Sequence, residues 1–173
     1  PTAEVEWLPL RQALGRYAAE AVQARVDNPA FDNSAMDGYA CRSADLAAHA
    51  HRLPLQGESS CGSAPGVLAA GTAMRIFTGA PMPAGADAAV MQENVSVEQG
   101  MALFPADTHS GENVRRRGED FRRGELLYAR GRRFNAYDLA LLATAGIDKV
   151  PVTVRPRVLV IATGDELVVP GTP

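Results

Sequence analysis

The pattern of hydrophobic and polar positions predicts two amphipathic helices. Apolar residues recur at helical spacing over residues 9–20, and Pro9 suits the first turn of a helix. The same spacing recurs over residues 135–145, where Asn135 can cap the N-terminus and Gly146 ends the pattern. The outer face of this second helix is also apolar, which predicts burial between two layers or at a subunit contact.

Between these helices the pattern changes to short runs separated by turns rich in Gly and Pro, which indicates a small β-rich module. Ser43 can cap a short helix that ends at Ala48. Glu98-Gln99-Gly100 has the composition of a hairpin turn. The predicted strands cover residues 52–58, 73–77, 88–93 and 101–105.

The C-terminal region has a different pattern. Val158–Ala162 is a continuous apolar run, which is typical of a strand covered on both faces in a parallel sheet. We therefore expect a different kind of domain to begin with this strand, with Thr163–Leu167 at the strand's carboxyl end, where open α/β sheets bind ligands. The chain stops soon afterwards, so we expect a fragment in which this strand is displaced, disordered or paired with another chain.

Composition places the chain among ordinary globular proteins. The 173 residues are 46% hydrophobic and 21% charged, with a net charge of −3, which favours neither nucleic acid nor membrane as a partner. Cys41 and Cys61 follow no redox or metal-ligand spacing, which favours a reduced, cytoplasmic chain but leaves a bridge between them open. His49 and His51 form either a metal pair or, as we prefer, a solvent-facing start of a strand.

The stretch from Asn28 to Ala40 has the composition of a functional loop. It combines turn-forming residues with two carboxylates, and Asp37 precedes Gly38, which permits a positive φ or a close approach by a ligand. Asp37 is therefore a candidate acid facing a metal or a phosphate. The alternative is that Asp-Gly is a simple turn between strands.

Two further segments are candidate anion sites. Thr78 offers a hydroxyl beside a free backbone N–H of Gly79, a modest anion-binding arrangement, although the local sequence alone favours a plain strand-ending turn. Residues 115–133 contain eight arginines, whose guanidinium groups bind phosphate bidentately; a salt-bridged surface is the alternative. Interleaved acids make nucleic acid a poorer explanation. The arginines are Arg115, Arg116, Arg117, Arg122, Arg123, Arg130, Arg132 and Arg133.

Four motifs resemble those of the molybdopterin molybdotransferases, the family that includes the gephyrin E domain. Asp32–Ala40 is the longest match, with nine consecutive residues. Thr78–Pro81, Arg115–Asp120 and Thr163–Leu167 are similar to the other three motifs and occur in the family's order. The resemblance extends over nearly the whole chain.

The resemblance implies insertion of molybdenum from molybdate into adenylylated molybdopterin, with release of AMP and a need for Mg²⁺. It implies an elongated, β-rich α+β protein that forms a homodimer, with molybdopterin adenylyltransferase and molybdoenzymes as possible partners. The implied catalytic residues are Asp37, Thr78, Asp120 and Glu166, the implied metal ligands are Asp37, Asp120 and Glu166, and the implied cofactor-binding residues are Ser34, Gly38, Gly79, Arg115, Arg116 and Arg117.

The implied domains are residues 1–26 with 121–155, an inserted β-rich domain at 27–120, and the start of the molybdopterin-binding α/β domain at 156–173. The family's active site lies where this α/β domain meets the first two domains of another subunit, so we expect this fragment to be inactive alone. A dimerising scaffold without catalysis is the alternative function. Asp165 as a simple helix cap is the alternative to a catalytic Glu166.

Overall fold

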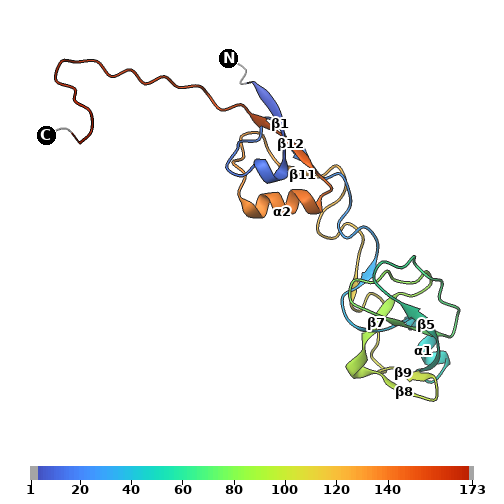
Figure 1. Cartoon of the computed structure of the whole chain (residues 1–173). Helices are drawn as coiled ribbons and strands as arrows, with labels where there is room; N and C mark the ends of the chain where they lie inside the picture. The colour runs from blue at the N-terminus through green and yellow to red at the C-terminus, as the bar shows by residue number, and fades with distance from the viewer. Residues whose placement is uncertain (1–3, 172–173) are drawn as a thin grey trace.

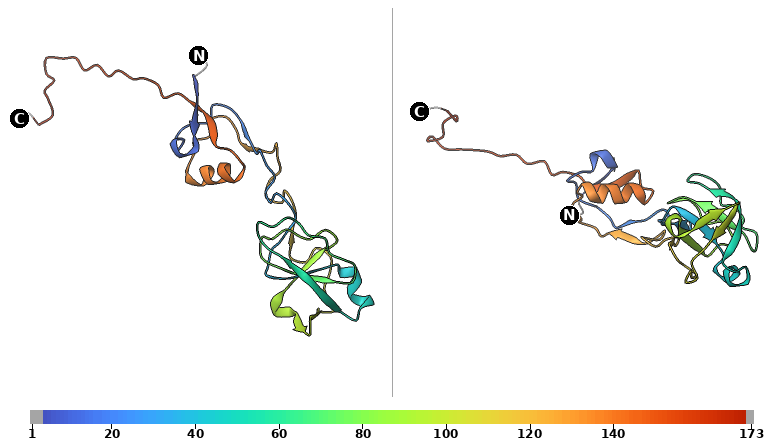
Figure 2. Two further views of the ribbon diagram at one scale, coloured as in Figure 1. Left: turned by 45° about the vertical axis from the view of Figure 1, so that its right-hand side comes forward. Right: turned by 90° about the horizontal axis from the view of Figure 1, so that it is seen from below.

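The computed structural model describes residues 4–171. Figures 1 and 2 show a β-rich fold in two parts that two segments of chain connect, with the C-terminal residues extending away from both. We call the part that contains the chain's first and last strands the helix lobe, and the other part the sheet lobe. The helix lobe consists of β1 (Val5–Pro9), η1 (Leu10–Gln12), β2 (Val22–Gln23), β11 (Leu126–Tyr128), α2 (Ala136–Thr144) and β12 (Lys149–Thr153).

The helix lobe joins the N-terminal residues to residues more than 100 positions later. β1 pairs antiparallel with β12 and β2 pairs antiparallel with β11, while α2 packs beneath them (Figure 1). Phe134 and Leu142 are fully buried at the centre of the lobe. The core therefore depends on pairing between distant segments.

The prediction of a helix over residues 9–20 is wrong. β1 covers its first residue, η1 supplies a single 3-10 turn, and the rest is irregular chain with bridges from Tyr17 to Arg133 and from Ala18 to Val152. Gly15 has φ +72°, which interrupts helical geometry. Long-range pairing buries the apolar positions that mimic a helical stripe.

The prediction of a helix over residues 135–145 is confirmed. The Asn135 side chain accepts a hydrogen bond from the Asp138 N–H, and the Asp138 carboxylate accepts one from the Asn135 N–H, which forms a capping box. The prediction that this helix is buried between two layers is wrong for this chain, because the Tyr137 side chain on its outer face is 86% exposed. Arg132 also donates two hydrogen bonds to the buried Asp138 carboxylate.

The sheet lobe is built on a curled sheet of six strands in the order β7-β4-β6-β5-β9-β8, in which β5 and β6 run parallel and the other neighbours antiparallel. The six strands are β4 (Gly38–Cys41), β5 (Arg52–Ser59), β6 (Ala73–Ile76), β7 (Ala88–Met91), β8 (Ser96–Glu98) and β9 (Met101–Leu103), and the lobe also contains α1 (Ser43–Ala48), η2 (Gln92–Asn94), β3 (Asn33–Ser34) and β10 (Val114–Arg115).

The four strands predicted for this lobe are confirmed, and each starts where it was predicted to start but ends at a different residue: Ser59, Ile76, Met91 and Leu103. Residues 92–93 begin η2 in place of continuing β7. The predicted hairpin turn is also confirmed: Gln99 and Gly100 both have positive φ and connect β8 to β9.

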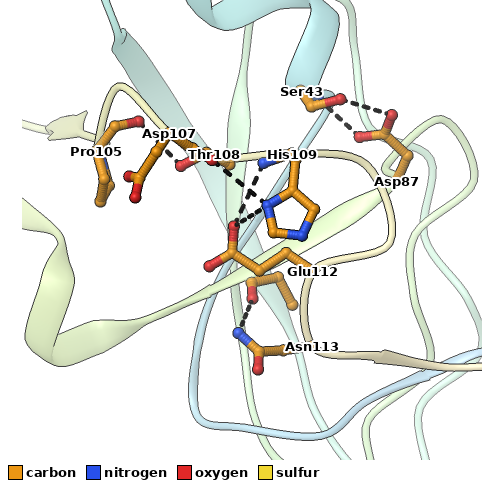
Figure 3. A network of polar contacts seen from close by, with 9 residues as sticks. Ser43, Asp87, Pro105, Asp107, Thr108, His109, Glu112 and Asn113 are labelled. Carbon is orange, nitrogen blue, oxygen red and sulfur yellow. Dashed lines mark hydrogen bonds and ion pairs between the residues drawn. The ribbon is translucent and has the colours of Figure 1, made fainter.

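The short helix α1 has the predicted range but a different cap. Arg42 occupies its N-cap position and makes no side-chain cap. The Asp87 carboxylate instead accepts hydrogen bonds from the Ser43 N–H and hydroxyl at 2.7 and 2.8 Å (Figure 3). An acid from another loop therefore satisfies the first turn, and the Ser43 hydroxyl donates to it.

The C-terminal segment forms no strand within residues 154–171. The side chains of Val158, Leu159, Val160 and Ile161 are between 73% and 85% exposed. Figure 2 shows this segment running away from both lobes in two views. Its position matches the expectation that the apolar run lacks its sheet here.

Candidate functional site

Asp37 and Thr78, which lie 41 residues apart in sequence, meet at one end of the sheet. Asp37 directly precedes β4, and Thr78 follows β6, which pairs with β4. The Thr78 N–H and hydroxyl both donate to Asp37 Oδ1, at 2.8 and 2.7 Å. Both residues are exposed. The structure thus brings together two of the predicted catalytic residues.

The Asp37 carboxyl group is stabilised as an anion. The hydrogen bond from the Thr78 N–H lowers its pKa most, the Thr78 hydroxyl adds to this, and the positive charge of Arg75 lowers it further. The pair therefore presents an ionised carboxylate at neutral pH.

Ser34 supports the loop that leads to Asp37. It is 1% exposed, and its hydroxyl donates to Met36 O at 2.6 Å. Its carbonyl accepts a hydrogen bond from the Gly79 N–H at 2.8 Å. The predicted free N–H at Gly79 is therefore wrong, because that group already holds the Asp37 loop against the Thr78 turn.

Gly38 is required by packing within the sheet. A Cβ at this position would lie 1.9 Å from Val90 O on β7. Its φ is not positive. The close approach predicted from the Asp-Gly pair is thus made by a neighbouring strand.

Arg75 is a feature of this site that the sequence patterns did not single out. Its guanidinium carbon lies 5.0 Å from the ring centroids of both Tyr39 and Phe77 and makes a cation–π contact with each. It also donates to Gln92 Oε1 at 2.5 Å. Strand alternation in paired β4 and β6 could have suggested the contact with Tyr39, because Tyr39 and Arg75 are register partners.

The arginines at 115–117 are paired with carboxylates. Arg115 contacts Asp120 at 2.6 Å and Arg116 contacts Asp32 at 2.7 Å. Arg117 contacts Asp27 at 2.6 Å. The salt-bridged alternative therefore describes these three side chains in this chain.

Asp120 lies where the two lobes join. Its carboxylate accepts hydrogen bonds from the Asn28 side-chain amide at 2.8 Å and from Arg115 at 2.6 Å. The backbones of Asn28 and Phe121 also form a bridge. Both carboxylate oxygens of Asp120 are thus engaged in holding this junction together.

The three predicted metal ligands do not converge in the described part of the chain. Among residues 4–171, no three His, Cys, Asp or Glu residues form a group that could hold a metal ion. Glu166 lies in the extended C-terminal segment. His49 and His51 lie in the turn before β5, where His49 is exposed and His51 is half-buried.

The comparisons with known proteins decide the family. The family described as "MoeA N-terminal region (domain I and II)" matches residues 1–146. The chain belongs to this family.

The relatives that this chain matches have consistent names. The molybdopterin molybdenumtransferases of Haemophilus influenzae and Bacillus subtilis are 39% and 38% identical to it, over 98% and 95% of this chain and 42% and 40% of their own length. Two structures of the molybdopterin biosynthesis MoeA protein from Pyrococcus horikoshii give TM-scores of 0.90 and 0.80 at 37% and 36% identity, covering 99% and 88% of this chain and 45% and 42% of those chains. The chain thus spans less than half the length of these relatives.

Two other findings concern the cysteines of this MoeA-family chain and its helices. Both cysteines are free, with Cys41 buried and Cys61 exposed. Within residues 4–171, no helix is long and apolar enough to cross a membrane.

Proposed function

We propose that this chain is the part of a molybdenum-inserting transferase that presents the Asp37–Thr78 pair to adenylylated molybdopterin. The reaction takes molybdenum from molybdate, places it on the molybdopterin and releases AMP. The observation that carries the proposal is the double hydrogen bond from Thr78 to Asp37, at a motif shared with a family whose relatives are named molybdopterin molybdenumtransferases.

Asp37 acts as the acidic group of the site. Both Thr78 donors bind Oδ1, which leaves Oδ2 of this exposed side chain to accept a hydrogen bond or to ligate a cation. The lowered pKa keeps the carboxylate ionised at neutral pH. Thr78 fixes the carboxylate's orientation, because its backbone N–H and its hydroxyl hold the same oxygen.

Mg²⁺ dependence belongs to the proposal, and the donors present fit one part of its coordination. Mg²⁺ commonly binds through one or two carboxylates, with waters and substrate phosphates completing the set. Asp37 supplies one hard oxygen of this kind. Mg²⁺ there would neutralise phosphate charge. Asp120 fits less well, since hydrogen bonds already engage both of its oxygens.

The remaining predicted residues take part in a wider site that a second subunit completes. In this arrangement Arg115, Arg116 and Arg117 exchange carboxylate partners for substrate phosphates, and Glu166 enters from the other chain. Ser34, Gly38 and Gly79 keep the loop and turn in place around the substrate.

In this proposal the biological unit is a cytoplasmic homodimer, which exchanges substrate with molybdopterin adenylyltransferase and molybdoenzymes. The free cysteines agree with a reducing compartment. The separate buried clusters of the two lobes support assigning residues 1–26 with 121–155 to one domain and 27–120 to another, with 156–173 opening a third.

A chimaera tests the proposal directly. This chain replaces the matching N-terminal part of the Haemophilus influenzae relative, and AMP release is measured with adenylylated molybdopterin, molybdate and Mg²⁺. We expect turnover in the chimaera, a loss of about 100-fold or more for Asp37→Asn, and wild-type rates for Asp107→Asn, an exposed acid on another loop.

Two results would overturn the proposal. One is full turnover by the Asp37→Asn chimaera. The other is a chimaera that is folded and dimeric by light scattering yet releases no AMP, while the intact relative is active in the same assay. That second result would support the dimerising scaffold instead.

A further inference from the structure

Arg75 is held more elaborately than an arginine on a sheet surface requires. Its guanidinium carbon lies 5.0 Å from the ring centroids of both Tyr39 and Phe77. Each is a cation–π contact, and the two together restrict where the guanidinium can lie.

The edge of the guanidinium is also fixed. One terminal nitrogen donates to Gln92 Oε1 at 2.5 Å, and the other approaches Gly38 O at 3.4 Å. The backbone N–H of Gln92 in turn donates to Asp37 O at 3.0 Å. The same side chain therefore reaches Gln92, whose N–H binds Asp37 O, and Gly38, which follows Asp37 in sequence.

These contacts surround the Asp37–Thr78 pair. Tyr39 lies two residues after Asp37, and Phe77 directly precedes Thr78. A guanidinium that contacts both rings thus links the start of β4 to the end of β6 at the position where the pair forms. Backbone pairing of β4 and β6 leaves the side chains beyond the strand ends free, and Arg75 removes that freedom.

We propose that Arg75 is the positioning residue of the Asp37–Thr78 pair, locking both members in the geometry used for chemistry. This inference rests on the proposed function, since positioning matters to turnover only if the pair takes part in it. Arg75 acts on the pair through its neighbours: no Arg75 nitrogen lies within 4.0 Å of an Asp37 carboxylate oxygen.

Lysine at this position isolates the geometric part of the role of Arg75. A lysine would keep the positive charge, but it lacks the planar group that contacts both rings and the fork that reaches Gln92. Arg75→Lys therefore separates charge from positioning, and Arg75→Gln removes both.

Hydrogen exchange of the Thr78 amide tests the positioning effect without turnover, because this N–H donates to Asp37 Oδ1. We expect this amide to exchange about 10-fold faster in Arg75→Gln and in Arg75→Lys than in wild type. The matched control is Arg52→Gln, which removes an exposed arginine from β5 of the same sheet. A Thr78 exchange rate in Arg75→Gln equal to that of wild type, or one raised equally by Arg52→Gln, would overturn the inference.

Turnover of the chimaera tests the positioning effect. We expect Arg75→Lys to lower kcat about 10-fold to 100-fold with KM within about twofold of wild type, as for a misplaced reacting group. Phe77→Leu keeps Arg75 and removes one ring, so it should lower kcat in the same way by a smaller factor. Arg52→Gln should leave kcat unchanged.

The two assays fail independently. If exchange of the Thr78 amide quickens as expected but no chimaera releases AMP, the proposed function fails and the effect of Arg75 on the Asp37–Thr78 pair stands. If the chimaera is active and Arg75→Lys and Phe77→Leu retain wild-type kcat, the inference fails and the proposed function stands. Thermal unfolding of each variant identifies one that does not fold, and Phe77→Leu then decides the question in place of Arg75→Lys.

Discussion

Replacing Gly38 with alanine tests how closely the sheet holds the candidate site. Gly38 follows Asp37 and pairs with both neighbouring strands, opposite Ile76 on β6 and Met91 on β7. The added methyl group would lie 1.9 Å from Val90 O and 2.8 Å from Val90 C. Both atoms are backbone atoms of a buried strand, so no side-chain rotation relieves the contact.

The expected cost follows from the movement needed. Raising the contact from 1.9 to 3.0 Å, the shortest distance real Cβ atoms tolerate, separates β4 from β7 by about 1.1 Å. The hydrogen bond from Gln92 N to Asp37 O, now 3.0 Å, would then exceed the hydrogen-bonding range. Losing one or two backbone bonds at about 1 kcal/mol each, with about 1–3 kcal/mol for overpacking, gives a destabilisation of about 3 kcal/mol.

Hydrogen exchange measures this change locally. The single tryptophan, Trp7, lies in the helix lobe, so its fluorescence would not report on this sheet. We expect amides of β4 and β7 to exchange about 100-fold faster in Gly38→Ala. Gly66→Ala is the matched control, because its Cβ would meet only the flexible Met74 side chain, at 3.6 Å or more.

A Gly38→Ala chain whose β4 and β7 amides exchange within about fivefold of wild type would refute this reasoning, since fivefold corresponds to about 1 kcal/mol. So would an equal effect in Gly66→Ala. Either result would mean that the two strands separate easily, and that Asp37 is held less closely than its contacts indicate.

Three further predictions concern the cap, the acidic residues and the thiols. Asn135→Ala removes half of the capping box of α2 and should destabilise the chain by about 1–2 kcal/mol in urea, whereas Asn135→Asp should lose little. Hydrogen bonds from the backbone N–H groups of Arg123 and Arg117 lower the pKa values of Asp27 and Asp32, respectively, below the ordinary 3.8. The stabilising effect of these two carboxylates is thus present above pH 3.8 and is lost as the pH falls from there through the folded-state pKa. When thermal stability is measured against falling pH, it should decline less steeply in this range for Asp27→Asn than for wild type. An unchanged slope would contradict this. Burial raises the pKa of the Cys41 thiol to about 12, so a thiol reagent near neutral pH should modify Cys61 alone until the chain unfolds, which mass mapping would check.

The parts of the fold predicted correctly from sequence are those specified by neighbouring residues. The α2 cap forms between Asn135 and a residue three positions later, and the Gln99-Gly100 turn needs only two residues that accept positive φ. The failed helix at residues 9–20 has the opposite origin. Its apolar spacing is local, but the residues are buried by strands that arrive from beyond residue 130.

The candidate site follows the same division. The sequence by itself determined the residue types and their motifs, from Asp37 and Thr78 to the arginines at 115–117, and these motifs identified the family that the comparisons later showed. Motif order depends only on the chain, so one sequence was enough to find it.

Only the tertiary structure decided what each of these residues touches. It brought the Thr78 N–H to Asp37 Oδ1 and Val90 O to the position that a Cβ at Gly38 would need. It also set the Arg75 guanidinium against the rings of Tyr39 and Phe77. It also paired the arginine segment with acids more than 80 residues away in sequence, such as Asp32. Such contacts depend on strand order and register, which arise when distant segments share one sheet, and local residue patterns do not encode them.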